Sequence, residues 1–183
     1  MGNARQVAMP SVRTPRTVLD DLLASGLDLV ICGSAVGLAS AAAACYYAGP
    51  GNRFWRTLHE VGLTPRQLHP AEFRTLSQFG IGLTDLVKAQ AGSDSQVSFR
   101  SADRERLRAR IRYCQPRVLS FNGKRAAQEF LGVKRVTFGL QAAAIGACSL
   151  FVAPSTSGAA RASWDFTVWQ ELAALVFARQ QPT

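Results

Sequence analysis

The sequence predicts a three-layer α/β/α sandwich built around a short four-stranded parallel sheet. Short apolar runs alternate along the chain with segments of helical periodicity, which is the order expected of an α/β domain. Most of these runs are unbroken by polar residues, which is typical of strands covered by helices on both faces. Apolar residues make up 48% of the 183 residues, enough for one domain with a substantial core.

Four apolar runs are the predicted strands. The first, at 27–32, is rich in Leu, Val and Ile and is followed by a loop of small residues at 33–37. The segment 80–87 contains two glycines ahead of an apolar stretch and is interpreted as a loop. The other three strands are expected at 117–121, 136–138 and 150–153.

Helical segments are predicted between these strands. Asn52 is a candidate cap for a helix whose apolar residues recur at helical spacing until Gly62. A C-terminal amphipathic helix is expected from Ser163 or Asp165 to Phe177. A short helical or turn segment is expected to begin at Asp20 and end near Gly26. Further helices or short helical pieces are expected at 65–67, 70–76, 103–113 and 126–131, with an Ala-rich stretch at 39–44.

A single domain at residues 17–183 contains all of these elements. Residues 1–16 are small, polar and basic and include two prolines, so we expect a flexible tail there. Ligands of parallel sheets bind outside the carboxyl ends of the strands. The expected binding edge is therefore made by the loops 33–37 and 122–124, a stretch near 139–146, and the loop 154–161.

The charge balance favours an anionic partner. The chain has 21 Lys and Arg against 12 Asp and Glu, a formal net charge of +9, which indicates nucleic acid or a membrane surface. Arginines in the helix 103–113 form two rows, each repeating every four residues. They are either a solvated face or a surface that follows phosphates. An equal candidate for the phosphate surface comprises Arg53, Arg56, Arg161 and the basic tail.

Cysteine spacing and hydropathy argue against several classes. The four cysteines show no C-x-x-C spacing and only two histidines are present, so we expect no zinc or other metal site. We interpret the cysteines as reduced thiols of a cytosolic protein. No apolar stretch approaches the roughly 20 residues of a membrane-spanning helix, and residues 1–16 lack the apolar core of a signal peptide.

Six blocks of sequence occur in an order that resembles one family. In this order they are similar to the mismatch-specific uracil/thymine DNA glycosylases, a branch of the uracil-DNA glycosylase superfamily. The resemblance extends over residues 27–161, and GPGNRFW is its most specific piece. The blocks are VICGSAVGL (30–38), YAGPGNRFW (47–55), GIGLTDLV (80–87), QPR with FNGK (115–117 and 121–124), FGLQ (138–141) and PSTSG (154–158).

The resemblance implies chemistry on a nucleotide flipped out of the duplex, because the glycosidic bond is unreachable inside the base stack. It implies that Tyr47 stacks on the flipped base and that Asp85 lies beside the base edge. An ordinary core tyrosine and a helix cap after Thr84 are the alternative interpretations of these two residues. Backbone and small side chains would shape the pocket at Gly33, Ser34, Ala35 and Gly37.

The same resemblance implies a wedge that enters the DNA helix at 155–161. The alternative is a solvent-exposed cap before the last helix. Its apolar tip would be Ala159, which is lighter than the bulky residue usual in the family. The residues implied to hold the distorted duplex are Ser155, Ser157, Gly158, Ala159, Arg161 and Arg53.

The first block departs from the family pattern. The family usually has Gly-x-Asn-Pro-Gly, where the Asn holds the hydrolytic water, but the Asn position here is Ala35 and the Pro position is Val36. The Ala side chain neither donates nor accepts a hydrogen bond. Two residues are candidates to compensate catalytically: Asp85, as a carboxylate that orients water or stabilises a sugar cation, and Asn52, whose alternative role is the helix cap.

The expected function is removal of uracil, with other deaminated bases such as hypoxanthine or xanthine, from DNA. We expect monofunctional hydrolysis by a monomer without a cofactor, since no lysine falls at an evident site for a lyase step. The expected partners are damaged DNA and the abasic-site product, and no membrane partner is expected. The expected location is the cytoplasm, in association with the nucleoid. The alternatives are a non-catalytic protein that binds lesions or abasic sites, and a nucleotide-binding α/β protein unrelated to repair.

Overall fold

The computed structural model describes residues 17–180, so the tail expected at 1–16 and the last three residues lie outside the described residues. In chain order the elements are β1 (Leu29–Val36), α1 (Leu38–Ala43), α2 (Phe54–Glu60), the 3₁₀ helix η1 (Pro70–Phe79), β2 (Ile81–Ala91), α3 (Ser101–Cys114), β3 (Val118–Asn122), α4 (Lys124–Leu131), β4 (Gly139–Ile145), β5 (Cys148–Ala153), the 3₁₀ helix η2 (Gly158–Ser163) and α5 (Phe166–Gln180).

The strands form one mixed sheet in the order β2-β1-β3-β5-β4. The pairs β1–β2, β1–β3 and β3–β5 are parallel, whereas β4 runs antiparallel to β5. The α/β class is therefore confirmed. The expectation of a four-stranded, all-parallel sheet is wrong in two respects: it lacked the parallel strand β2, and it did not include the antiparallel orientation of β4.

The strand β2 occupies the segment that the sequence indicated as a loop. All residues from Ile81 to Val87 are buried. The two glycines that favoured a loop have other roles. Gly80 has a φ of 70° and ends η1, and a Cβ on Gly82 would lie 2.6 Å from the carbonyl oxygen of Leu22, where the N-terminal segment crosses the strand. Asp85 is thus a strand residue, and its alternative as a helix cap is wrong.

Two other strand predictions need correction. The first strand begins at Leu29 and continues to Val36, so most of the expected loop 33–37 is extended chain paired with β2. The strand expected at 136–138 is instead β4, at Gly139–Ile145. Its outer position leaves Leu140 57% exposed, so β4 lacks the continuous apolar run by which buried strands are recognised.

The helical predictions are closer to the structure. The helices near 53–61, 103–113, 126–131 and 165–177 are present as α2, α3, α4 and α5, with ends shifted by a few residues. The Ala-rich stretch is α1, and the piece at 70–76 is part of η1. No helix forms at 65–67 or at 20–23; instead Leu22 makes an antiparallel bridge to Leu83 of β2.

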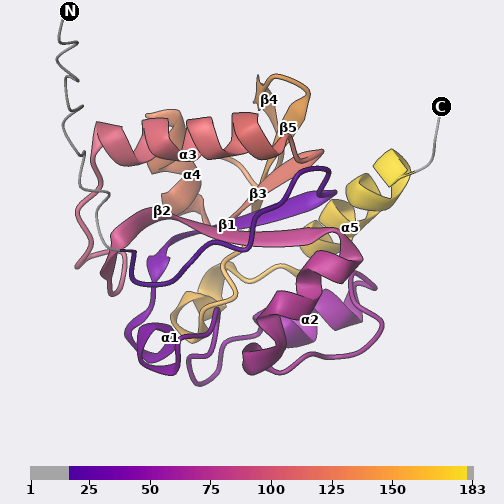
Figure 1. Cartoon of the computed structure of the whole chain (residues 1–183), viewed down its shortest axis with the longest axis horizontal. Helices are drawn as coiled ribbons and strands as arrows, with labels where there is room; N and C mark the ends of the chain where they lie inside the picture. The colour runs from indigo at the N-terminus through magenta and orange to yellow at the C-terminus, as the bar shows by residue number, and fades with distance from the viewer. Residues whose placement is uncertain (1–16, 181–183) are drawn as a thin grey trace, which may run out of the picture.

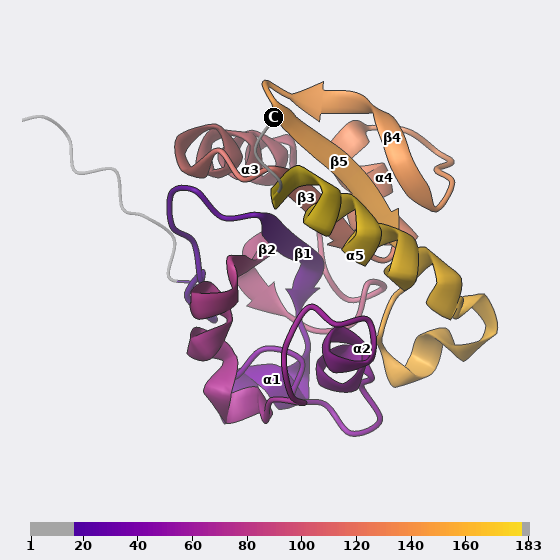
Figure 2. The same cartoon turned by 90° about the vertical axis from the view of Figure 1, so that its right-hand side faces the viewer.

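Helices cover both faces of the sheet (Figure 1). On one face α3 and α4 pack through residues such as Leu107, Ile111 and Phe130. On the other face lie α2, η1 and α5, with α5 running alongside the β3–β5 half of the sheet (Figure 2). The protein is therefore a three-layer sandwich, as the alternation of apolar and periodic segments predicted.

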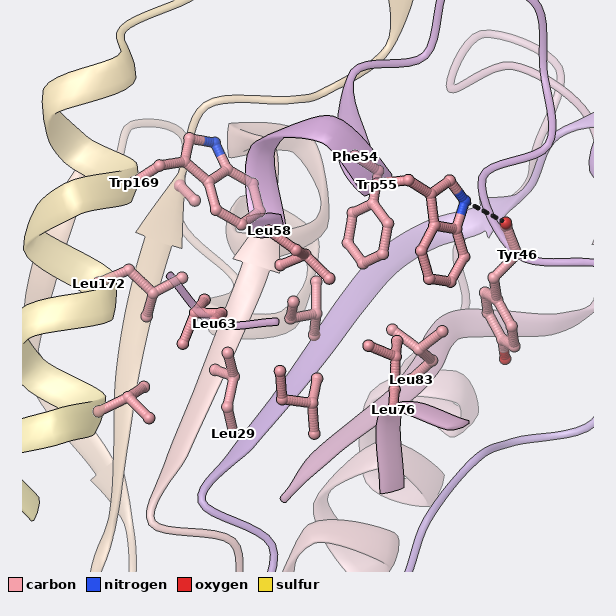
Figure 3. Close-up of a cluster of buried hydrophobic side chains, with 14 of the residues drawn as sticks. Leu29, Tyr46, Phe54, Trp55, Leu58, Leu63, Leu76, Leu83, Trp169 and Leu172 are labelled. Atoms are coloured by element: carbon pink, nitrogen blue, oxygen red, sulfur yellow. Dashed lines mark hydrogen bonds between the residues drawn. The ribbon is translucent and has the colours of Figure 1, made fainter. Parts of the chain in front are cut away.

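Aromatic side chains pack in the core between the sheet and the layer formed by α2, η1 and α5 (Figure 3). Phe54 packs edge-on against both Trp55 and Trp169, with ring centroids 5.1 and 6.5 Å apart. The Trp55 indole N–H donates a hydrogen bond to the carbonyl of Tyr46 at 3.2 Å. This core therefore fixes the start of the segment that carries Tyr47.

Candidate active-site cleft

A cleft of about 740 Å³ opens at the carboxyl edge of the parallel strands. Its walls come from the ends of four strands, β1, β2, β3 and β5, together with the loop after α1. This is where an open α/β sheet binds its ligands. The lining segments are 33–40, 47–52 (except Ala48 and Gly51), 92–96, 122–125 and 155–160, with Val36 the one gap in the first.

One wall of the cleft differs from the expected binding edge. The stretch 139–146 is β4 itself, whose carboxyl end lies at the opposite edge because the strand is antiparallel. Its place is taken by Gly92–Gln96, which leaves the carboxyl end of β2. The sequence did not predict segment 92–96 as a wall of the cleft because 80–87 was interpreted as a loop. Had 81–91 been recognised as a strand, the residues after its carboxyl end would have been expected at the binding edge.

Asp85 lies just behind the lining of the cleft, next to Gly33. The two residues are register partners in the parallel pair β1–β2. A Cβ added to Gly33 would lie 2.6 Å from Asp85 Oδ1 and 3.6 Å from the Tyr47 hydroxyl. Gly33 and Tyr47 line the cleft, whereas Asp85 itself is not part of the lining and is only 3% exposed. The missing side chain of Gly33 is therefore what leaves room for this carboxyl group.

Burial dominates the electrostatics of Asp85. The pKa of the Asp85 carboxyl is raised to about 6: desolvation is the largest cause, Lys88 and Arg110 oppose it, and the nearby Asp21 adds to it. The Lys88 ammonium is 3.9 Å from Asp85 Oδ2. No group among residues 17–180 donates a hydrogen bond to the carboxylate. Its oxygens therefore retain capacity to accept a proton or a hydrogen bond.

Tyr47 lines the cleft beside Gly33. The ring stacks on Phe54 with centroids 3.8 Å apart and planes inclined by 21°, and the residue has a φ of 53°, an uncommon conformation outside glycine. Its hydroxyl is buried without a partner at bonding distance among the described residues. Burial and Asp85 raise the pKa of this hydroxyl, whereas the neighbouring Asn122 amide lowers it.

The other residues implied for the pocket lie along one wall. Ser34, Ala35 and Gly37 line the cleft at the end of β1 and the start of α1. Ala35 is partly buried against the α3–α4 core. The structure thus brings all the predicted pocket residues to one edge of the sheet, with Asp85 just behind them.

Asn52 lines the cleft but its side-chain oxygen is engaged. Asn52 Oδ1 accepts a hydrogen bond from the backbone N–H of Phe54 at 3.0 Å, at the start of α2. Asn52 thus makes a bond of the capping kind from one position ahead of Arg53, the residue at the N-cap of α2, whose own side chain makes no capping bond.

The segment 155–161 forms the wall opposite β1. Ser155, Ser157, Gly158 and Ala159 line the cleft, while Arg161 is exposed in η2 and outside the lining. The segment is anchored from below: Asn122 donates to Thr156 Oγ1 at 2.9 Å and accepts from the Thr156 N–H at 3.0 Å.

Arg53 supports this wall from within. Its backbone N–H donates to the Thr156 carbonyl at 2.9 Å, and its guanidinium lies over the Trp164 ring, 5.1 Å from the centroid. One guanidinium nitrogen, Nη1, is buried without a hydrogen-bond partner among the described residues. The geometry places Arg53 behind the segment 155–161 rather than at its outer surface.

Three arginines of α3 contact neighbouring side chains of the protein, although Arg106 and Arg112 are themselves exposed. Arg108 lies over the Phe130 ring of α4 at 4.5 Å, Arg106 pairs with Asp103, and Arg110 pairs with Asp21 at 2.6 Å. These contacts favour a packing role for the helix over a surface that follows phosphates.

Between residues 17 and 180, no three His, Cys, Asp or Glu side chains are arranged to hold a metal ion. No helix in that range is both long and apolar enough to cross a membrane.

Comparison with known proteins gives the family. The profile of the uracil DNA glycosylase superfamily matches residues 21–175, which include every wall of the cleft and Asp85. The chain belongs to the uracil-DNA glycosylase superfamily. The expected family is thus confirmed at the level of the superfamily, while the mismatch-specific branch stays a prediction.

A solved structure is similar to this superfamily member over almost the whole chain. It is the solution NMR structure of a protein from Methanosarcina acetivorans, provisionally assigned as a uracil DNA glycosylase. The two are 22% identical and align with a TM-score of 0.57, over 91% of this chain and 99% of the other. At this identity the likeness concerns the fold.

Proposed function

We propose that this member of the uracil-DNA glycosylase superfamily hydrolyses the N-glycosidic bond of uracil in DNA. In this reaction the bond between C1′ of the sugar and the base nitrogen breaks, water supplies a hydroxyl to C1′, and the released proton ends on the departing base. A cleft of about 740 Å³ is large enough for a flipped nucleotide, and the net charge of +9 suits a polyanionic substrate.

The observation that carries this proposal is the Asp85 carboxylate next to Gly33. It is buried, and its Oδ1 and the Tyr47 hydroxyl both lie within 4 Å of where a Cβ on the lining residue Gly33 would stand. It has free acceptor capacity in a family member whose usual water-holding Asn is replaced by Ala35. A carboxylate in this position orients the attacking water or stabilises positive charge at C1′.

The pKa of Asp85 fits such a role at neutral pH. With a pKa of about 6, the group is mainly ionised at pH 7.5 and still basic enough to accept a proton from water. Excision that needs the carboxylate form falls as the pH drops through about 6. Tyr47 supplies the aromatic face for the base, and Asn52 stays a weaker catalytic candidate because its oxygen already accepts from the Phe54 N–H of α2.

A carboxylate beside the base edge also bears on base range. Uracil N3–H and hypoxanthine N1–H both donate hydrogen bonds, and a carboxylate accepts from either. We therefore include hypoxanthine and xanthine among the proposed substrates. Cleavage of uracil alone, across a panel of duplexes with each deaminated base, would argue against this range.

The test is a single-turnover assay on uracil-containing single- and double-stranded DNA, with enzyme in excess and alkali cleavage of abasic sites. Wild-type protein is expected to excise uracil, and Asp85→Ala to lose at least 100-fold in rate, within the range of general acid–base effects. Asp85→Asn separates charge from hydrogen bonding. The matched control is Asp20→Asn, because the Asp20 side chain is exposed and, among residues 17–180, accepts a hydrogen bond from Thr17 alone.

A second candidate is a protein that binds lesions or abasic sites without cutting them. Two observations favour it: Ala35 replaces the water-holding residue, and Asp85 is behind the cleft lining rather than part of it. Tight, damage-selective binding with no excision in the same assay would establish this function and overturn the first.

A further inference from the structure

A cluster of four charged side chains lies behind the cleft lining, at the outer edge of β2 where the N-terminal segment pairs with the strand. The Lys88 ammonium is 2.7 Å from Asp21 Oδ1 and 3.9 Å from Asp85 Oδ2. The Arg110 guanidinium of α3 is 2.6 Å from Asp21 Oδ2. Two carboxylates and two cations therefore share one partly buried site, but the cations sit unequally between the carboxylates.

Asp21 is held in this cluster by the backbone around it. The N-terminal segment pairs with the edge of β2: the Val18 N–H donates to the Lys88 carbonyl at 2.8 Å, and Leu22 and Leu83 exchange hydrogen bonds at 2.9 Å. The Thr84 hydroxyl adds a bond to Asp21 Oδ1 at 2.7 Å. Asp21 is thus held in place by β2, although it lies 63 residues before Thr84 in the sequence.

Both cations are committed to Asp21. Lys88 also donates to the Tyr46 hydroxyl at 3.1 Å, which leaves only the long 3.9 Å contact to Asp85. Arg110 approaches Asp85 through the backbone alone, donating to its carbonyl oxygen at 3.1 Å. Asp21 therefore holds the two groups that would otherwise form hydrogen-bonded ion pairs with the Asp85 carboxylate.

We propose that Asp21 is a positioning residue of the proposed glycosylase: by holding Lys88 and Arg110 it keeps the Asp85 carboxylate free of hydrogen-bonded cations and available to the cleft. The inference rests on the function proposed above for Asp85. A carboxylate paired directly with an ammonium is a weaker base and hydrogen-bond acceptor toward water. Asp21 acts through Lys88 and Arg110, at a distance from substrate.

The other groups that face Asp85 are uncharged at neutral pH. They are Cys32 on β1 and Tyr46 and Tyr47 after α1, and burial raises the pKa of each well above its ordinary value. The pKa of Asp21 is itself lowered, since Lys88 and Arg110 outweigh its desolvation. The charge that surrounds Asp85 is therefore set by Asp21, Lys88 and Arg110.

The decisive experiment compares two substitutions that are expected to act in opposite directions. Asp21→Asn removes the anion that holds Lys88, so the cation turns toward Asp85; together with the loss of the Asp21 charge, this lowers the titration midpoint of Asp85 by about one pH unit. The part due to Lys88 is the part of this fall that disappears when Asp21→Asn is made in the Lys88→Met protein. Lys88→Met removes the cation and raises that midpoint by about as much. Both are measured by ¹³C NMR titration of the Asp85 carboxyl and by the acid limb of the single-turnover pH profile.

Asp20→Asn is the matched control, because it makes the same change one residue away on an exposed side chain, and it is expected to leave the midpoint in place. Shifts in the same direction for Asp21→Asn and Lys88→Met, or no shift in either, would overturn the inference. If Asp21→Asn does not fold, Lys88→Met still tests whether Lys88 controls the titration midpoint of Asp85. If no protein excises uracil, the proposed function fails, while the NMR titration still decides the role of Asp21.

Discussion

At the scale of single residues, the cleft depends on a missing side chain. Gly33 and Asp85 are register neighbours, and the space that a Cβ would fill at Gly33 is occupied by Asp85 Oδ1 at 2.6 Å. Real Cβ atoms do not approach an oxygen so closely, and Asp85 is enclosed by Tyr47 and β1. Gly33 is therefore needed for the position of the carboxylate rather than for backbone freedom.

Gly33→Ala is expected to reduce uracil excision by about 100-fold, because a displacement of about 1 Å at a reacting group costs that much. The measurement is the single-turnover rate at pH 7.5. Gly37→Ala is the comparison, since its Cβ would meet no atom within 4 Å. A Gly33→Ala rate close to that of Gly37→Ala would contradict the geometry derived for Asp85.

Asp85 also sets a relation between activity and stability. Its pKa is raised to about 6, so the folded protein holds this proton more tightly than the unfolded chain does. The carboxyl group then lowers the free energy of unfolding as the pH rises from about 4 through 6, by about 3 kcal/mol in all at 1.36 kcal/mol per pKa unit. The ionised Asp85 carboxylate therefore destabilises the fold, while the proposed reaction requires this charged form.

Asp85→Asn is therefore expected to be more stable than wild type above pH 7, by up to about 3 kcal/mol, and equally stable near pH 4. Denaturant unfolding at both pH values measures this difference. Asp20→Asn, with an exposed side chain, is the control. A stability gain that is the same at both pH values would show that Asp85 is not a titrating buried acid.

At the scale of elements, the wall 155–161 is held by a two-way bond from β3. Asn122 both donates to and accepts from Thr156, and a Cβ on Gly123 would lie 3.2 Å from Ser155 Cβ. The end of β3 therefore fixes the position of residues 155–156, the start of the segment that the family resemblance implies enters the DNA.

Asn122→Ala is expected to cost about 1–3 kcal/mol of stability, because it leaves the buried Thr156 N–H without its acceptor. Hydrogen exchange should also become faster at residues 155–161. Gln128→Ala, which removes an exposed bond to the Lys134 carbonyl, is the matched amide deletion. Equal effects of the two changes on the segment would contradict the clamp.

At the scale of the whole molecule, the net charge is +9, and its basic side chains are of two kinds: some contact neighbouring side chains, and others are exposed at the surface. On α3, Arg106, Arg108 and Arg110 contact neighbouring side chains. Arg112 borders a separate cavity with Ile145–Cys148, at the other end of the sheet. Arg161 is exposed beside the cleft. The phosphate surface is thus expected near Arg161 rather than along α3.

Affinity for duplex DNA is expected to fall linearly on a plot of log K against log salt. Arg161→Gln should make the slope shallower by about one, the contribution of a single phosphate contact, whereas Arg112→Gln should leave it unchanged. Fluorescence anisotropy over a salt series measures both. A change of slope in Arg112→Gln alone would move the DNA surface to the far end of the sheet.

The sequence by itself determined the α/β class, most helices and the superfamily, because these depend on local periodicity and on blocks such as GPGNRFW. It also placed Tyr47, Ala35 and Asp85 in blocks that the fold brings to one edge. It failed at β2 and β4. The glycines of β2 serve a helix end and a chain crossing, and β4 is an exposed edge without an apolar run.

Only the tertiary structure decided the surroundings of Asp85. The groups that set its charge come from the N-terminal segment, β2 and α3, and Asp21 and Arg110 are separated by 89 residues. Spacing along the chain carries no trace of such contacts, because burial and ion pairing depend on which strands and helices become neighbours. For the same reason the wall 92–96 became visible only when β2 took its place at the edge of the sheet.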